Sequence, residues 1–162
     1  MYKIKEIDIK VDEEQNIILG QAHFIKTVED VYEVLITSFP GIKFGIAFNE
    51  ASGDRLIRTD GNDDELIEKS AEYAEKIGVG HSFVIILKNA YPINILNRVK
   101  QVMEVVNIYA ATSNPIKVLV YDDNEEGRAI IGVIDGKKPL GRENQQDKEK
   151  RHKFLRDIGY KR

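Results

Sequence analysis

An unbroken apolar strand at residues 83–87 constrains the fold of this chain more than any other feature. The run Phe-Val-Ile-Ile-Leu lacks the alternation of a half-exposed strand, which indicates a strand that is buried on both faces. Two further apolar strands are expected at 17–25 and 42–48, and a hairpin is expected at 116–134. Because helical segments alternate with these strands, the sequence predicts an α/β fold, a three-layer α/β/α sandwich with a mixed sheet.

Capping and stop signals predict four helices. Thr27 with Asp30 three residues later is an N-cap signal, and Pro92 suits the first position of a helix. The small side chains of Gly45 and Ala47 share one face of a strand and would let a helix pack closely against it. The expected helices span residues 27–39, 62–77, 92–105 and 144–157.

The length of 162 residues predicts a single domain spanning 1–162. An apolar content of 42% and a charged content of 31% are typical of a soluble globular protein, with no membrane partner. The N-terminal MYKIKEIDIK does not resemble a signal peptide. The lack of cysteine excludes disulfides and thiol catalysis, and the cytoplasm is the expected compartment. Many Lys, Glu and Ile residues without Cys or Trp are typical of a thermophile.

The net charge of −3 conceals a basic tail. From Arg142 onward there are eight Lys or Arg against four Asp or Glu, a net charge of +4. A basic tail can contact nucleic acid or a phosphorylated ligand. The aromatic residues of the tail are not interleaved with the basic ones in the way that single-stranded nucleic-acid binding requires, so we interpret the tail as a solvated helix and expect no nucleic-acid partner.

Polar residues lie at the exits of three of the predicted strands, where ligands commonly bind in open α/β sheets. Amides, carboxylates, arginines and a histidine together suit an adenine, a ribose and an anion. The residues are Gln21, His23, Lys26 and Thr27 after the first strand; Asn49, Glu50, Ser52, Gly53, Asp54, Arg55 and Arg58 after the second; and Asn89, Asn94 and Asn97 after the third.

Candidate roles follow from the chemistry of these groups. The helix N-terminus at Thr27 can hold phosphate through free N–H groups and the helix dipole. The forked donors of Arg55 or Arg58 match phosphate oxygens. Glu50 or Asp54 can accept ribose hydroxyl protons or act as a base. The stretch 52–54 also fits a simple turn, and this alternative stays open.

Two histidines are candidates for covalent chemistry. His23 lies at the exit of a strand, although a lone histidine is more often structural than catalytic. His81 opens a strand, and a parallel sheet would place it at the opposite edge unless its strand runs antiparallel. No metal site is predicted, since the acidic residues at 60–64 are better explained as first-turn acids that favour the helix dipole. The common phosphate-binding motifs GxxxxGK[ST] and GxGxxG are absent.

Long segments of the chain resemble the adenosine-specific kinase family. They are ILGQAHFIKTVED, PGIKFGIAFNEASGDRLIRTDGND, GHSFVIILKNAYPINILNRVK, ATSNPIKVLVYD and GRAIIGVIDGKKPLG. The resemblance implies a three-layer α/β fold that binds adenosine and AMP, but not ADP or ATP, and that carries a stably phosphorylated histidine. Both His23 and His81 lie in matching segments, and the strand-exit argument favours His23.

Two functions are compatible with this resemblance. In the first, the protein is an adenosine kinase in which His23 or His81 passes a phosphoryl group to adenosine, with Asp54 as a further catalytic candidate. It would need a phosphoryl donor, with Mg²⁺ as the candidate companion ion. In the second, the same pocket senses adenosine or AMP without turnover. A homo-oligomer, with three copies as the working expectation, is predicted in either case.

Overall fold

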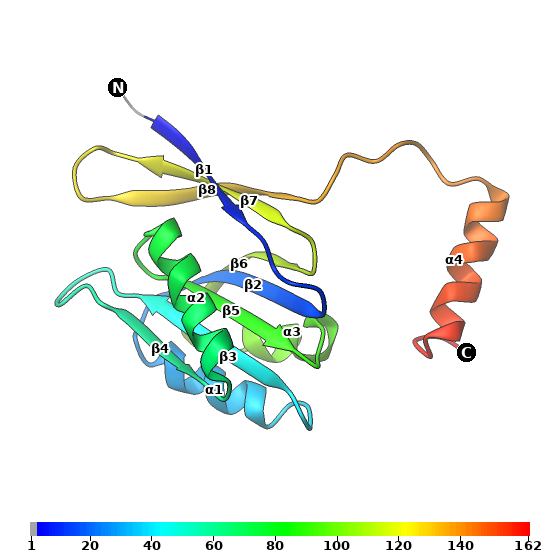
Figure 1. The fold of residues 1–162 in the computed structure, drawn as a ribbon, viewed down its shortest axis with the longest axis horizontal. Coiled ribbons are helices and arrows are strands. Elements are labelled where there is room, and N and C mark those ends of the chain that lie inside the picture. Colours follow the sequence, from blue (N-terminus) through cyan, green and yellow to red (C-terminus); the bar gives the residue numbers. More distant parts are fainter. Residues whose placement is uncertain (1–2) are drawn as a thin grey trace.

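In the computed structural model, residues 3–162 are described and form eight strands and four helices (Figure 1). In chain order these are β1 (Lys3–Ile9), β2 (Gln15–Ala22), α1 (Thr27–Ile36), β3 (Lys43–Asn49), β4 (Ile57–Gly61), α2 (Asp64–Ile77), β5 (Ser82–Lys88), α3 (Pro92–Lys100), β6 (Val105–Thr112), β7 (Ile116–Asp122), β8 (Arg128–Asp135) and α4 (Gln145–Asp157). None of the helices within residues 3–162 combines the length and the apolar character required to cross a membrane.

The strands form two sheets, one of five strands in the order β4-β3-β5-β2-β6 and one of three in the order β1-β7-β8. Every strand pair in the described part of the chain is antiparallel, so the parallel pairs implied by a mixed sheet are a wrong prediction. The helix α1 does connect two strands of the same direction, β2 and β3. However, β5 lies between them and runs the opposite way.

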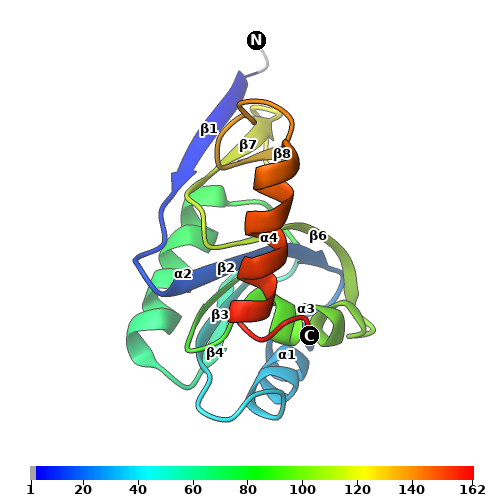
Figure 2. The ribbon, with the colours of Figure 1, turned by 90° about the vertical axis from the view of Figure 1, so that its right-hand side faces the viewer.

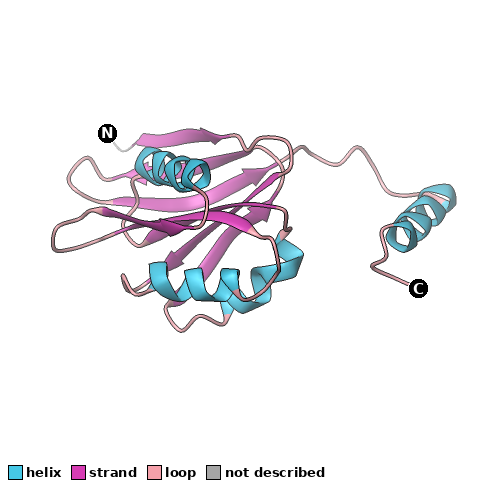
Figure 3. Cartoon of the chain, turned by 60° about the horizontal axis from the view of Figure 1, so that its bottom comes forward, coloured by secondary structure: helices cyan, strands magenta, loops and turns pink. Residues whose placement is uncertain are grey.

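The elements pack in layers, which confirms the predicted α/β layered fold. Helices α1 and α3 cover one face of the five-stranded sheet. Helix α2 and the three-stranded sheet cover the other face (Figure 3). Residues 83–87 of β5 are fully buried, as their unbroken apolar pattern predicts.

Both edge strands of the larger sheet escaped the sequence prediction. β4 lies in a polar stretch expected to be a loop, and it pairs only with β3. β6 follows the predicted helix 92–105, which in the structure already ends at Lys100. Two register shifts against β2 disturb the alternation of β6. Edge strands with mixed polarity therefore lack the signal that identified β5.

Helix α2 is held at both ends by its capping residues. Asp63 accepts a hydrogen bond from the Leu66 N–H at 3.2 Å, and Gly78 adopts a left-handed conformation with φ of 57°. Asn62, the first residue of the predicted helix, instead bonds the backbone of Ile42 and Phe44. Helix α2 therefore starts at Asp64, two residues later than predicted.

Asp122 ties the three strands of the smaller sheet together, and its contribution should depend on pH. Its carboxylate accepts from Lys5 Nζ at 2.7 Å, from Arg128 Nε at 3.1 Å and from the Asn124 N–H at 3.0 Å. The Lys5 hydrogen bond, followed by the Asn124 N–H, lowers the pKa of Asp122 to about 2.

A carboxyl group with a lowered folded-state pKa stabilises the protein above its unfolded pKa, and this effect disappears as pH falls through the folded value. We therefore expect Asp122→Asn to reduce the free energy of unfolding at pH 6. The difference from wild type should shrink between about pH 4 and pH 2. Urea unfolding across this range measures it, and an unchanged difference at pH 2 would contradict the assignment.

Candidate functional site

Two histidines next to neighbouring strands of the five-stranded sheet lie at the same end of these strands. His23 follows the end of β2, and His81 precedes the start of β5. Since β5 runs antiparallel to β2, the end of one strand lies beside the start of the other. Both residues line a cavity of about 200 Å³, with Phe24, Ile25, Phe48, Glu50, Ala51 and Ser52. The strand therefore has the antiparallel direction that the sequence left open, and the parallel arrangement that would separate the two histidines is not found.

The backbone of His81 is fixed in an unusual conformation. Its φ of 66° lies in the left-handed region, which residues other than glycine rarely adopt. Its N–H donates to the Asn49 carbonyl at 2.7 Å, and its carbonyl accepts from the Ala22 N–H at 2.9 Å. The imidazole stacks on Phe48, with ring centroids 6.0 Å apart and planes 27° apart. Such strained and strongly supported positions concentrate at functional sites.

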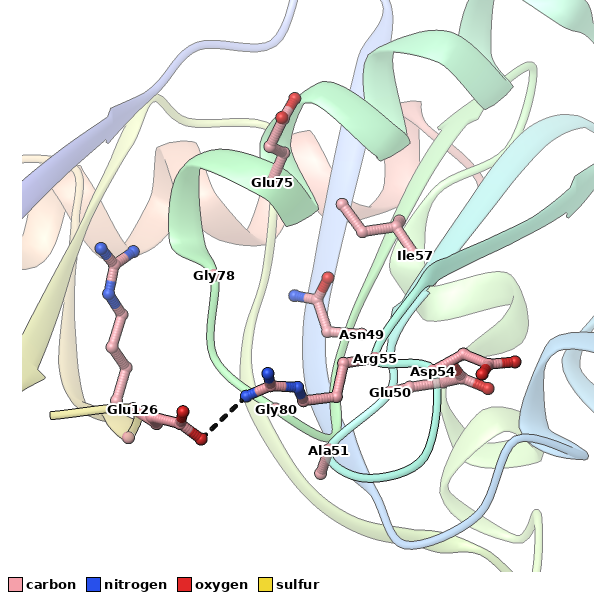
Figure 4. A pocket seen from close by; sticks show the side chains of 12 residues that line it. Asn49, Glu50, Ala51, Asp54, Arg55, Ile57, Glu75, Gly78, Gly80 and Glu126 are labelled. Carbon is pink, nitrogen blue, oxygen red and sulfur yellow. Dashed lines mark hydrogen bonds and ion pairs between the residues drawn. The ribbon is translucent and has the colours of Figure 1, made fainter.

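A larger cleft of about 790 Å³ adjoins this two-histidine cavity and shares Glu50 and Ala51 with it. Its volume lies in the range of small-molecule sites. The β3–β4 loop, the end of α2 and the β7–β8 turn form its walls, and Figure 4 shows Arg55 reaching across to Glu126. The lining residues are Asn49, Glu50, Ala51, Asp54, Arg55, Ile57, Glu75, Gly78, Gly80, Glu126, Gly127 and Arg128.

Glu50 stands at the junction of the cavity and the cleft as an ionised carboxylate. One oxygen accepts from the Leu56 N–H at 2.8 Å, and the other pairs with Arg58 Nη2 at 3.0 Å. The Leu56 hydrogen bond, followed by Arg58, lowers the pKa of Glu50. A carboxylate with a lowered pKa is a weak base but a good acceptor for hydroxyl groups. The Nε of Arg58 is buried and has no hydrogen-bond partner in the described structure.

The start of α1 does not offer the free N–H groups expected at Thr27. The Thr27 N–H and hydroxyl both donate to the Phe24 carbonyl, and the next N–H groups also bond the preceding turn. Lys26 pairs with Asp30 and, at 3.2 Å, with Glu104. These hydrogen bonds, first that of Asp30, raise the pKa of Lys26. The local turn and the two carboxylates thus occupy the groups predicted to hold a phosphate.

The structure places the remaining predicted residues in two regions. Ser52 lines the two-histidine cavity, whereas Asp54 and Arg55 line the cleft and Gly53 forms the turn between them with φ of 69°. Asn49 is buried, and its amide donates to the Ala74 carbonyl and to Ser82 Oγ. Gln21 accepts a hydrogen bond from the Tyr109 hydroxyl at 3.2 Å.

Asn89 and Asn94 lie beyond the opposite end of β5. Asn89 donates to the Gly41 carbonyl at 3.2 Å, and Asn94 caps α3 by accepting from the Tyr91 N–H at 2.8 Å. Asn97 is exposed on α3. The structure therefore does not bring these three asparagines to the histidines.

Sequence reasoning missed four residues that shape the site. Phe48 stacks on His81, and its only sequence signal is its place just before the polar strand exit. Glu126 comes from the β7–β8 turn and Arg128 from the start of β8, and their approach to the cleft is a long-range contact that local sequence does not indicate. Glu104 is buried, and its carbonyl accepts from the His23 N–H at 3.0 Å. It lies in a stretch that was expected to be helical.

Comparisons with known proteins agree with this architecture. The chain is similar to the crystal structure of the PH1918 protein from Pyrococcus horikoshii OT3, with 48% sequence identity and a TM-score of 0.95. The similarity covers 100% of this chain and 99% of that one. No curated protein matches the chain. The family model described as adenosine specific kinase matches residues 7–161. The chain therefore belongs to the adenosine-specific kinase family.

Proposed function

We propose that this protein binds adenosine and AMP in the cleft and transfers a phosphoryl group from a histidine to the 5′-hydroxyl of adenosine. The observation that carries the proposal is the junction of the nucleoside-sized cleft with a cavity lined by two histidines. A nucleoside in the cleft can direct its 5′ end past Glu50 toward these histidines. Membership of the adenosine-specific kinase family supports adenosine as the ligand.

In this proposal the bond between phosphorus and the histidine nitrogen breaks while the bond to the 5′ oxygen forms. The hydroxyl proton leaves by way of Asp54 and ends on the freed imidazole, so the enzyme returns to its starting state. Ionised Glu50 accepts hydrogen bonds from the ribose. Arg58 holds Glu50 in this position through the ion pair from its Nη2 at 3.0 Å.

Within the two-histidine cavity we favour His81 as the phosphorylated residue. The antiparallel direction of β5 removes the reason for preferring His23. His81 has a strained backbone, hydrogen bonds on both sides and a stacked ring, which together hold the imidazole in place. His23 is exposed, and only its N–H is anchored, by the Glu104 carbonyl. A fixed nucleophile loses less conformational freedom when it reacts.

The donor enters this scheme as a second substrate, and Mg²⁺ would arrive on its phosphate oxygens. Within residues 3–162, no three His, Asp or Glu side chains are grouped so that they could hold a metal ion. The proposal therefore assigns no step to a protein-bound metal. We further propose that the protein is a cytoplasmic homo-oligomer of three copies.

The arrangement of charges favours a second candidate, a sensor that binds adenosine or AMP without turnover. Three of the cations near the site already pair with carboxylates: Lys26 with Asp30 and Glu104, Arg55 with Glu126, and Arg58 with Glu50. A transferring phosphoryl group would have to compete with these ion pairs. The sequence also lacks a phosphate-cradling loop.

One experiment separates the two candidates. The protein is incubated with adenosine and each nucleoside triphosphate labelled in its terminal phosphate, with and without Mg²⁺. A kinase forms labelled AMP above the level of the His81→Asn variant. A sensor binds adenosine in calorimetry but forms no AMP with any donor. Absence of both binding and turnover would contradict the assignment of the cleft.

A further inference from the structure

The last 27 residues, 136–162, leave the body of the protein as an arm. Figure 1 shows an extended linker that carries α4 away from both sheets, and Figure 2, viewed from that side, shows α4 in front of the body. Among the described residues, the hydrogen bonds and ion pairs of α4 join positions 143–161 to one another. No residue of α4 is buried by its own chain.

An arm of this kind is unstable without a surface to cover it. A single helix of 13 residues is marginal in water, because most helical stability in proteins comes from packing. The end of α4 also exposes a group of large apolar side chains. Phe154 is 59% exposed, Ile158 is 44% exposed and Tyr160 is 49% exposed, and Leu140 in the linker is fully exposed. Phe154 and Ile158 lie four residues apart and so share one face of the helix.

The extended position of the arm also occurs in a related protein. The crystal structure from Pyrococcus horikoshii OT3 superposes with a TM-score of 0.95 over 100% of this chain. A score this close to one over the full length requires that the arm superposes together with the body. Two sequences with 48% identity thus place the arm outside their own body in the same way.

The charge of the arm indicates what surface it fits. The arm contains ten Lys or Arg and four Asp or Glu, a net charge of +6. Residues 1–135 contain fourteen Lys or Arg and 23 Asp or Glu, a net charge of −9. The arm and the body are therefore complementary in charge, although within one chain the linker keeps them apart (Figure 1).

We propose that the arm docks on the body of a second copy of this chain, so that neighbouring copies exchange arms. The apolar end of α4 supplies the buried part of the contact, and its basic residues face the acidic body of the neighbour. The exchange removes exposed apolar surface that the chain cannot bury alone. This proposal is independent of the phosphoryl-transfer chemistry and concerns how the copies are held together.

The test measures the mass of the full-length protein in solution by light scattering after size exclusion. We expect wild type to have a multiple of the 18.5 kDa chain mass. Phe154→Glu/Ile158→Glu should shift it to the mass of one chain. The matched control Gln146→Glu/His152→Glu adds the same two charges at exposed polar positions of α4 and should leave the mass of the oligomer unchanged.

The body should stay folded in both variants, since α4 contributes no buried residue to it, and far-ultraviolet circular dichroism with thermal unfolding checks this. A wild-type protein with the mass of one chain would overturn the proposal. So would a Phe154→Glu/Ile158→Glu variant that keeps the wild-type mass. Dissociation of the control variant to the same extent would also contradict an apolar contact by the end of α4.

Discussion

Replacing His81 with asparagine should remove a mass increment of about 80 Da from the purified protein, the mass of one phosphoryl group. Asparagine tolerates the left-handed backbone that His81 adopts, so the variant keeps the local conformation while it loses the imidazole. The hydrogen bonds to Asn49 and Ala22 involve only the main chain and should persist. The expected effect is complete loss of the increment, because His23 is exposed and only its N–H is anchored, so it should not replace His81 as the nucleophile.

Intact-mass spectrometry of freshly purified protein measures this result, and His23→Asn is the matched control. His23 lines the same cavity but is exposed, so its replacement should keep the increment. The same two variants should differ in formation of labelled AMP. Loss of the increment in His23→Asn alone would identify His23 as the phosphorylated residue. Its presence in both variants would show that neither histidine carries the group.

The features of the fold that local sequence can encode were predicted correctly. The unbroken apolar run at 83–87 indicated a strand buried on both faces, and β5 is the central strand of the larger sheet. The alternation of strands and helices indicated a layered α/β fold. Asn144 was expected to start the tail helix, and it caps α4.

Strand direction could not be predicted, and this one error misplaced half of the site. A helix between β2 and β3 suggests adjacent parallel strands, but whether a later strand inserts between them depends on long-range pairing. Once β5 lies there in the opposite direction, His81 joins His23 and Asn89 moves to the far end of the strand. Local spacing contains no information on such an insertion.

The free N–H groups expected at the N-terminus of α1 are absent for a different reason. Thr27 and Asp30 have the spacing of a capping pair, yet Thr27 bonds Phe24 and Asp30 pairs with Lys26. Side chains at the start of a helix can form hydrogen bonds with several alternative local partners of similar energy. Here Lys26 also donates a hydrogen bond to Glu104, which lies 78 residues away in the sequence, so the partners at this helix start include a long-range one.

Gly45 is the position where sequence and structure agree most closely, and it leads to a prediction about stability. Its small size was expected to let a helix approach the sheet, and α2 packs directly on it. A Cβ added at Gly45 would lie 2.2 Å from the carbonyl carbon and oxygen of Leu66, which belong to the backbone of α2. Ser70 Oγ also donates to the Gly45 carbonyl at 2.9 Å, which holds the helix at this distance.

Gly45→Ala should therefore reduce the free energy of unfolding by about 3 kcal/mol or more, because a helix backbone cannot move aside as a flexible side chain can. This is a large part of the typical total of about 5–15 kcal/mol. Gly132→Ala is the matched control, since no atom lies within 4 Å of its added Cβ, and it should change stability by less than about 0.5 kcal/mol. Urea unfolding of both variants measures the difference. Equal stability of the two variants would mean that α2 does not pack closely against β3 at Gly45 in solution.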